Sequence, residues 1–247
     1  MSGQLNLYVS HQIGTGPAAS SRPGVVVHLL GSFELRVGDR PVSLSAGAQR
    51  LVALLALRGR CGRSRLAGEL WPDTTEQRAM GSLRTTIWRI NQAAPGLVES
   101  TPGSAELEAS AEVDVRRLID LSRGLLASDL AAEDLAIATR TGDLLPDWED
   151  EWLTVDRERL RQLQLHVLEA QAERLLRIGA YGLALECALT ALRAEPLRES
   201  AHRTVIRIHL AEGNRTEARR AYDRCVELFD RELGLLPSDL TAALLAS

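Results

Sequence analysis

Apolar and polar positions in the first third of the chain alternate with two different periods. Residues 25–44 are rich in Val and Leu and alternate with period two in FELRV, while Gly38-Asp39 supplies a tight turn. This stretch therefore predicts a small antiparallel sheet. Residues 97–109 repeat the pattern as two short apolar runs around Pro102-Gly103, which predicts a terminal hairpin.

Between the sheet and the hairpin, apolar residues recur at helical spacing. Glycines and prolines divide this part into three helices, predicted at 46–58, at 63–70, and from Asp73 or Thr74 to about Ala93. Strands, three helices and a terminal hairpin, in that order, are the layout of a winged helix-turn-helix, whose third helix enters the DNA major groove.

The third predicted helix has two unlike faces. Its apolar face gathers Ala79, Met80, Leu83, Ile87 and Ile90. Its opposite face gathers Arg78, Gly81, Ser82, Thr85, Trp88, Arg89 and Gln92. Guanidinium, hydroxyl and amide groups are those that read base edges, and a glycine allows close approach. The alternatives are that Arg78 and Arg89 pair with nearby carboxylates, and that Trp88 packs on a neighbouring helix.

The second half of the chain contains a repeat of 34 residues. Gly179 and Ala184 recur as Gly213 and Ala218, which is the tetratricopeptide spacing of paired helices with Gly at the turn. Further helical pattern covers 115–126, 130–139, 156–178 and 237–245. Stacks of this type bind other proteins, so we expect a partner-binding module; a dimerisation or spacer domain is the alternative.

Charge is distributed unevenly along the 247 residues, whose net charge is −4 and whose cations are all arginine. Between Arg50 and Arg89, eight arginines (50, 58, 60, 63, 65, 78, 84, 89) face three carboxylates (69, 73, 76). From Asp114 onward, 18 arginines face 24 carboxylates. A basic patch of this kind is typical of nucleic-acid binding, although a solvated helix surface is the alternative.

Several classes of protein do not fit the sequence. The longest apolar run, 51–57, is far short of a membrane span, and residues 1–24 look like a flexible leader rather than a secretory signal. The three cysteines fit a reducing cytoplasm as core residues. We therefore expect a cytoplasmic protein without membrane contact.

Enzymatic and metal sites are not expected either, and no cofactor is implied. The five histidines lack metal-ligand spacing with the cysteines, and no phosphate loop or nucleophile elbow occurs. Carboxylates at 147, 149, 150 and 151 alternate with Trp148 and Trp152. That cluster is expected to cap the helical stack or to contact a basic partner.

Longer segments carry a resemblance to a known family. LVALLALRGRCGRSRLAGELWP and RAMGSLRTTIWRI, followed by DLLPDWEDEWL and EPLRESAHRTVIRIHLAEGNRTEARRAYDRCVELFDRELGLLPS, are similar to the Streptomyces antibiotic regulatory proteins. The resemblance covers residues 25–247. It implies a mainly α chain: a leader (1–24), an OmpR-like winged-helix DNA-binding domain (25–112) and a tetratricopeptide-like bacterial transcriptional activation domain (113–247).

The resemblance also implies a function. It points to an activator of a biosynthetic gene cluster that binds promoter direct repeats as a homodimer and recruits RNA polymerase. The residues expected at DNA are Arg63, Arg65, Arg78, Ser82, Arg84, Thr85, Trp88, Arg89 and Gln92. One departure is the wing turn, GSAEL at 103–107, which lacks a cation for the minor groove. The alternative is therefore a tetratricopeptide-type adaptor with weak or no DNA binding.

Overall fold

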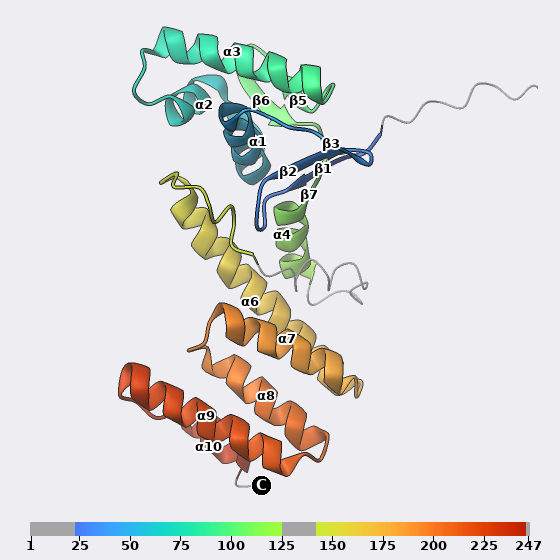
Figure 1. The fold of residues 1–247 in the computed structure, drawn as a ribbon, viewed down its shortest axis with the longest axis vertical. Helices are drawn as coiled ribbons and strands as arrows, with labels where there is room; N and C mark the ends of the chain where they lie inside the picture. The colour runs from blue at the N-terminus through green and yellow to red at the C-terminus, as the bar shows by residue number, and fades with distance from the viewer. Residues whose placement is uncertain (1–22, 125–141, 246–247) are drawn as a thin grey trace, which may run out of the picture.

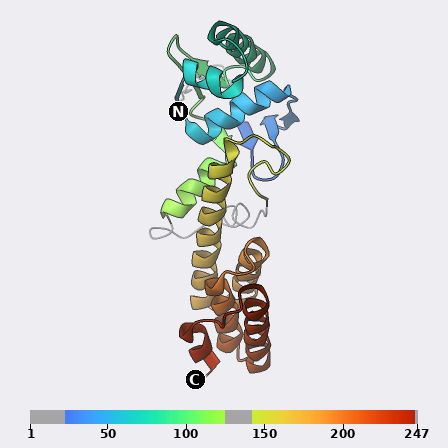
Figure 2. The same ribbon diagram turned by 90° about the vertical axis from the view of Figure 1, so that its left-hand side faces the viewer.

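The computed structural model describes residues 23–124 and 142–245. The molecule is elongated, with a mixed α/β unit at one end and a stack of helices at the other (Figures 1 and 2). The long helix α6 (Leu153–Arg177) joins the two ends and, at 25 residues, is about 37 Å long. The helices predominate, so the mainly α fold expected from the sequence is confirmed.

The N-terminal unit contains two small sheets and three helices. The first sheet has the order β3-β2-β1-β7, from strands Arg40–Pro41, Glu34–Val37, Val25–His28 and Glu112–Val113. The second sheet has the order β4-β6-β5, from strands Cys61–Gly62, Ser104–Leu107 and Val98–Ser100. The helices are α1 (Ala46–Arg58), α2 (Arg63–Leu70) and α3 (Glu76–Ala93). A winged helix-turn-helix is therefore present, with β5 and β6 as the wing.

The structure corrects the predicted elements in two places and leaves two predictions untested. The third helix begins later than expected, at Glu76, with Thr75 rather than Asp73 or Thr74 in the capping position. Strands β4 and β7 were not predicted, because two residues are too few to show a period. The helix expected at 130–139 and the leader up to residue 22 lie outside the described residues.

The helical unit follows the 34-residue repeat. Its helices are α4 (Asp114–Gly124), α6, α7 (Tyr181–Ala194), α8 (Glu199–Ala211), α9 (Arg215–Leu233), α10 (Asp239–Ala242) and a final 3-10 turn (Ala243–Leu245). Gly179 and Gly213 occupy the turns within the α6–α7 and α8–α9 pairs, with φ of 75° and 84° that only glycine adopts easily. Ala184 and Ala218 are fully buried where helices cross closely. The predicted repeat is confirmed.

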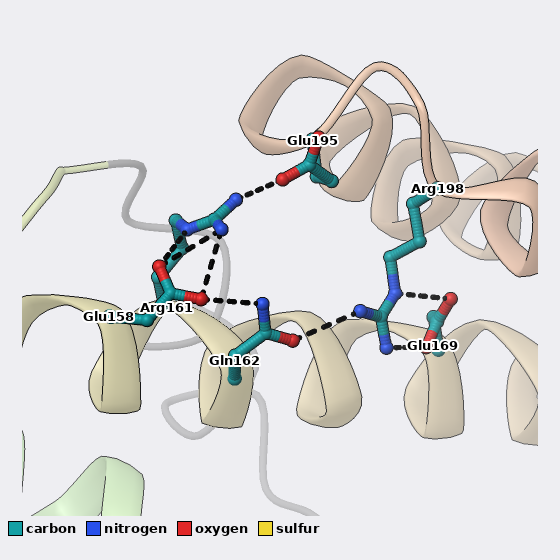
Figure 3. Close-up of polar contacts among 6 residues, drawn as sticks. All are labelled: Glu158, Arg161, Gln162, Glu169, Glu195 and Arg198. Carbon is teal, nitrogen blue, oxygen red and sulfur yellow. Dashed lines mark hydrogen bonds and ion pairs between the residues drawn. The ribbon is translucent and has the colours of Figure 1, made fainter. Parts of the chain in front are cut away.

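A polar network fastens the first helix pair to the second (Figure 3). Arg161 on α6 binds Glu158 and also Glu195, which lies in the turn between α7 and α8. Arg198, from the same turn, donates to both oxygens of Glu169 on α6 at 2.9 and 2.8 Å. Burial raises the pKa of Glu169, but the hydrogen bonds from Arg198 and Ser200 outweigh it and leave that pKa below its usual value. The segment EPLRES (195–200) thus connects the two helix pairs through its ion pairs with α6.

The two units are joined at the end of strand β1. Strand β7 pairs with β1 in parallel, and the buried carboxylate of Asp114 accepts hydrogen bonds from the backbone N–H groups of Leu29 and Leu30 at 2.9–3.0 Å. Asp114 is the first residue of α4. The boundary expected between residues 112 and 113 therefore falls inside a strand that completes the N-terminal sheet.

The segment before α6 docks on the same place. Leu144 and Leu145 are buried, and the Leu145 N–H donates to the carbonyl of Leu29 at 3.0 Å. Trp148 stacks on Phe33 with ring centroids 6.2 Å apart. Arg157 on α6 donates to the carbonyls of Leu144, Leu145 and Trp148 and so holds this segment in shape. The predicted cluster of tryptophans and carboxylates contacts the N-terminal unit of its own chain.

Gly142 makes the closest backbone approach at this junction. A Cβ atom built on Gly142 would lie 2.8 Å from the backbone nitrogen of Gly31 and 2.9 Å from its Cα. The Gly31 N–H is at that point donating to the Asp143 carbonyl at 3.0 Å. A side chain at position 142 would therefore push apart two backbone segments that hydrogen bond to each other.

We predict that Gly142→Ala lowers the free energy of unfolding by about 1–3 kcal/mol, the usual effect of overpacking. Gly68→Ala is the matched control: Gly68 lies in α2, where an added Cβ meets nothing within 4 Å. The control should stabilise the protein by about 0.5–1 kcal/mol. Urea unfolding followed by circular dichroism measures both, and an unchanged Gly142→Ala midpoint would contradict the tight junction.

Candidate nucleic-acid interface

Helix α3 crosses the outer end of the molecule, opposite the helical stack (Figure 1). Its buried stripe consists of Ala79, Leu83, Ile87 and Ile90, which pack into the N-terminal core. Its outer side chains point away from that core because the apolar positions recur at helical spacing. The end of α3 is held to the wing by Asn91, whose amide group exchanges two hydrogen bonds with the backbone of Val98 at 2.9 and 3.0 Å.

Three arginines on α3 keep their charge available. Arg78, Arg84 and Arg89 are exposed and form no hydrogen bond or ion pair with any residue in the described part of the chain. The alternative that Arg78 and Arg89 pair with nearby carboxylates is therefore wrong for those residues. Trp88 is 61% exposed, so it does not pack on a neighbouring helix of the described chain either.

The neutral side chains of this face differ in what they offer. The Thr85 hydroxyl donates to the carbonyl of Gly81, four residues earlier, at 3.1 Å, so it presents its acceptor lone pairs outward. Gln92 is exposed, and Ser82 is half-buried. Seven residues of α3 were predicted to contact DNA. Apart from Ser82 they are all exposed: Arg78, Arg84, Thr85, Trp88, Arg89 and Gln92.

The two arginines at the start of α2, predicted to lie at DNA, differ in their contacts within the chain. Arg63 donates to the Ser100 hydroxyl at 2.8 Å and to the Thr101 carbonyl at 3.3 Å, and so ties α2 to the wing. Arg65 is largely exposed and has only a distant partner, Glu69 at 3.8 Å. Of the two, Arg65 is the freer cation.

The wing gains cations that its own sequence lacks. Arg60, just before β4, donates to the Ser104 hydroxyl at 3.0 Å and lies 3.9 Å from Glu106. Strand β4 pairs with β6 and places Arg60 and Arg63 beside the wing turn. Sequence reasoning missed Arg60 because it depends on a strand of two residues, although the arginine-rich run RGRCGR was the available signal.

The basic patch is smaller than its sequence count suggested. Arg50 binds Asp150 through its Nε atom at 2.8 Å, and Arg58 lies 3.4 Å from Glu69 and 3.5 Å from Asp156. Two of the eight arginines thus neutralise carboxylates at the junction. The remaining cations gather on α3, at the start of α2 and at the wing.

A comparison with protein families places the second half of the chain. The family described as the bacterial transcriptional activator domain matches residues 112–247, more than half of the chain. The chain belongs to this family. Proteins of this family are transcription regulators, a class that is generally not enzymatic. A search of curated proteins gives no match.

A solved structure has a similar fold over most of the chain. It is that of Mycobacterium tuberculosis EmbR in complex with a low-affinity phosphopeptide, with a TM-score of 0.69 and 18% sequence identity. The similarity covers 91% of this chain, including the N-terminal unit, and 64% of the EmbR chain. The chain thus spans less than two thirds of the length of that relative. Among the helices that the structure describes, none is long and apolar enough to cross a membrane.

Gly81 allows the role of the α3 surface to be separated from folding. It lies on the outer side of the helix, and in the free protein no atom lies within 4 Å of a Cβ added at this position. We predict that Gly81→Ala stabilises the protein by about 0.5–1 kcal/mol, because alanine favours helix. DNA affinity should nevertheless fall about tenfold or more, equivalent to roughly 1.4 kcal/mol, because the methyl group obstructs close approach to the groove.

Fluorescence anisotropy with labelled promoter DNA measures the affinity, and thermal unfolding measures the stability. Gly182→Ala in α7 is the control: its added Cβ also meets nothing, but it lies in the helical stack. It should leave DNA binding unchanged. Equal DNA affinity of Gly81→Ala and wild type would exclude close packing of this face on DNA.

Proposed function

We propose that the chain is a sequence-specific, DNA-binding transcriptional activator whose helix α3 enters the major groove. The observation that carries this proposal is the exposed, unpaired arginine face of α3 in a chain of the transcriptional activator family. A free guanidinium can bind a guanine edge with two hydrogen bonds. Arg65 and the arginines at the wing are suited to phosphate groups on either side of the groove, as expected of an OmpR-like domain.

The finer parts of the proposal concern the promoter and the partner. We propose direct repeats in the promoter of a biosynthetic gene cluster as the target, bound by two protomers, and RNA polymerase as the partner of the helical unit. The acidic helical unit repels phosphate, so its contribution to the function is sought in protein contact rather than in DNA affinity. The alternative is an adaptor with little DNA affinity. Against it stands the position of Arg60 and Arg63 beside the acidic wing, where Arg60 lies 3.9 Å from Glu106.

DNA binding and its salt dependence separate the activator from the adaptor. Neutralised phosphates release counterions, so the logarithm of the binding constant should fall linearly with the logarithm of salt concentration, by about 0.9 per phosphate contact. We expect a clear negative slope on the DNA that flanks the gene itself. Affinity too weak to measure at low salt would favour the adaptor.

Arg89 and Arg65 are predicted to affect binding in different ways. Arg89→Ala should weaken specific binding by about 1–3 kcal/mol more than binding to random DNA, because a base contact is lost. Arg65→Ala should weaken both about equally and reduce the salt slope by about one, because a phosphate contact is lost. Both side chains are exposed, so folding should be unaffected. If Arg89→Ala left the ratio of the affinity for specific DNA to the affinity for random DNA unchanged, Arg89 would not contact a base as proposed.

Activation is tested with a fragment that preserves the junction. A fragment ending near Glu112 would cut β7 and remove Asp114, so it is unsuited to the purpose. A fragment ending at Arg161 keeps Asp114, Leu145, Asp150 and Arg157 but lacks the stack from α7 onward. We predict that this fragment binds the promoter but does not stimulate transcription.

The measurement is in vitro transcription with purified RNA polymerase, at protein concentrations that give equal promoter occupancy. Circular dichroism and thermal unfolding confirm that the fragment is folded. Full-length protein should stimulate the promoter and the fragment should not. Equal stimulation by both would assign the helical stack a role other than polymerase recruitment.

A further inference from the structure

A cavity of about 690 Å³ lies at the junction between the two units. One wall comes from α1 and the end of α2, and the other from the segment that leads into α6, which lies directly below them in Figure 1. Trp71 borders it from the first side and Trp152 from the second. We propose that this cavity binds a small organic cation, an ammonium group carried on an apolar body, and that the ligand bridges the two units.

The charges on the cavity wall determine which sign of charge the ligand should carry. Arg50 is balanced by Asp150, because its Nε atom lies 2.8 and 3.0 Å from the two carboxylate oxygens. Glu69 is likewise balanced by Arg58, 3.4 Å away. The carboxylate of Glu151 is exposed and has no hydrogen bond or ion pair within residues 23–124 and 142–245. The wall therefore offers one unsatisfied negative charge.

The two indoles supply the rest of the recognition. Aromatic rings, and indoles above all, attract cations through their electron-rich faces and also provide apolar surface. Trp152 is held in place by a 3.3 Å hydrogen bond from its Nε1 atom to Asp150. An anion would instead meet three carboxylates and an arginine whose charge is already paired. Apolar rings with an unpaired carboxylate thus favour an ammonium-bearing ligand.

Such a ligand would be linked to the arrangement of the units. Trp71 immediately follows α2, in the DNA-facing unit, and Trp152 immediately precedes α6, which leads into the helical stack. A molecule that contacts both binds the docked arrangement and not a separated one. By mass action it stabilises the docked state in proportion to its concentration over its dissociation constant.

The test uses three probes with the same ring and different charge: benzylammonium, neutral benzyl alcohol and anionic benzoate. Each is titrated into the full chain at pH 7 and followed by ligand-observed NMR. Benzylammonium should bind saturably, about tenfold or more tightly than the other two, because it gains the carboxylate and the cation–π contacts. It should also raise the temperature of unfolding.

Two matched variants locate the binding. Glu151→Gln should weaken benzylammonium binding about tenfold, while removing a charge that has no partner in the described chain and therefore leaving the fold intact. Glu149→Gln removes another exposed charge, two residues away, that does not border the cavity, and should leave binding unchanged. Tighter binding of benzoate, equal binding of all three probes, or equal loss in both variants would overturn the proposal.

Discussion

The backbone at the end of strand β1, residues 27–31, is the part of the molecule on which the relation between the two units depends. It exchanges hydrogen bonds with two parts of the C-terminal chain: residues 112–114, which include strand β7 and the carboxylate of Asp114, and the segment at 143–145. Buried backbone N–H and C=O groups are costly to leave unpaired. The helical unit therefore completes the N-terminal sheet through residues 112–114 and 143–145.

The junction also explains an apparent contradiction in the charge of the chain. The basic patch is followed in sequence by an acidic cluster, and some arginines of the patch form ion pairs with carboxylates of the cluster or near it. Arg50 lies 5.7 Å from the centroid of the Trp148 ring while it binds Asp150, so a cation, an indole and a carboxylate form one contact. Of the eight arginines between Arg50 and Arg89, the three without a partner among the described residues, Arg78, Arg84 and Arg89, lie at the far end of the molecule on α3. The ion pairs of Arg50 and Arg58 thus lie at the junction, while the unpaired arginines of α3 lie at the opposite end of the N-terminal unit.

This architecture connects the end that carries α3 to the helical stack through a continuous series of packed elements. Helix α6 starts at the junction, where Arg157 holds the segment that docks on β1, and continues into the first helix pair. The ion pairs Arg161–Glu195 and Arg198–Glu169 then join that helix pair to the next. The N-terminal unit and the stack are thus linked by paired backbone at the junction and by ion pairs between the helices. The cavity between Trp71 and Trp152 lies beside the first link of this path.

The sequence by itself determined the elements and the faces that they present. Period-two and helical patterns gave the hairpins and α1 to α3, and the 34-residue spacing of Gly179 and Gly213 gave the helix pairs, because both depend on local geometry. Only the tertiary structure decided which arginines are free and that Arg60 reaches the wing. It also showed that Asp114 and Leu145 complete a sheet about 85 and 115 residues away along the chain. Such contacts cannot be predicted from a periodic pattern, because the sequence does not distinguish an arginine that forms an ion pair from one that does not. Strands of two residues are likewise recognisable only once their pairing partners are known.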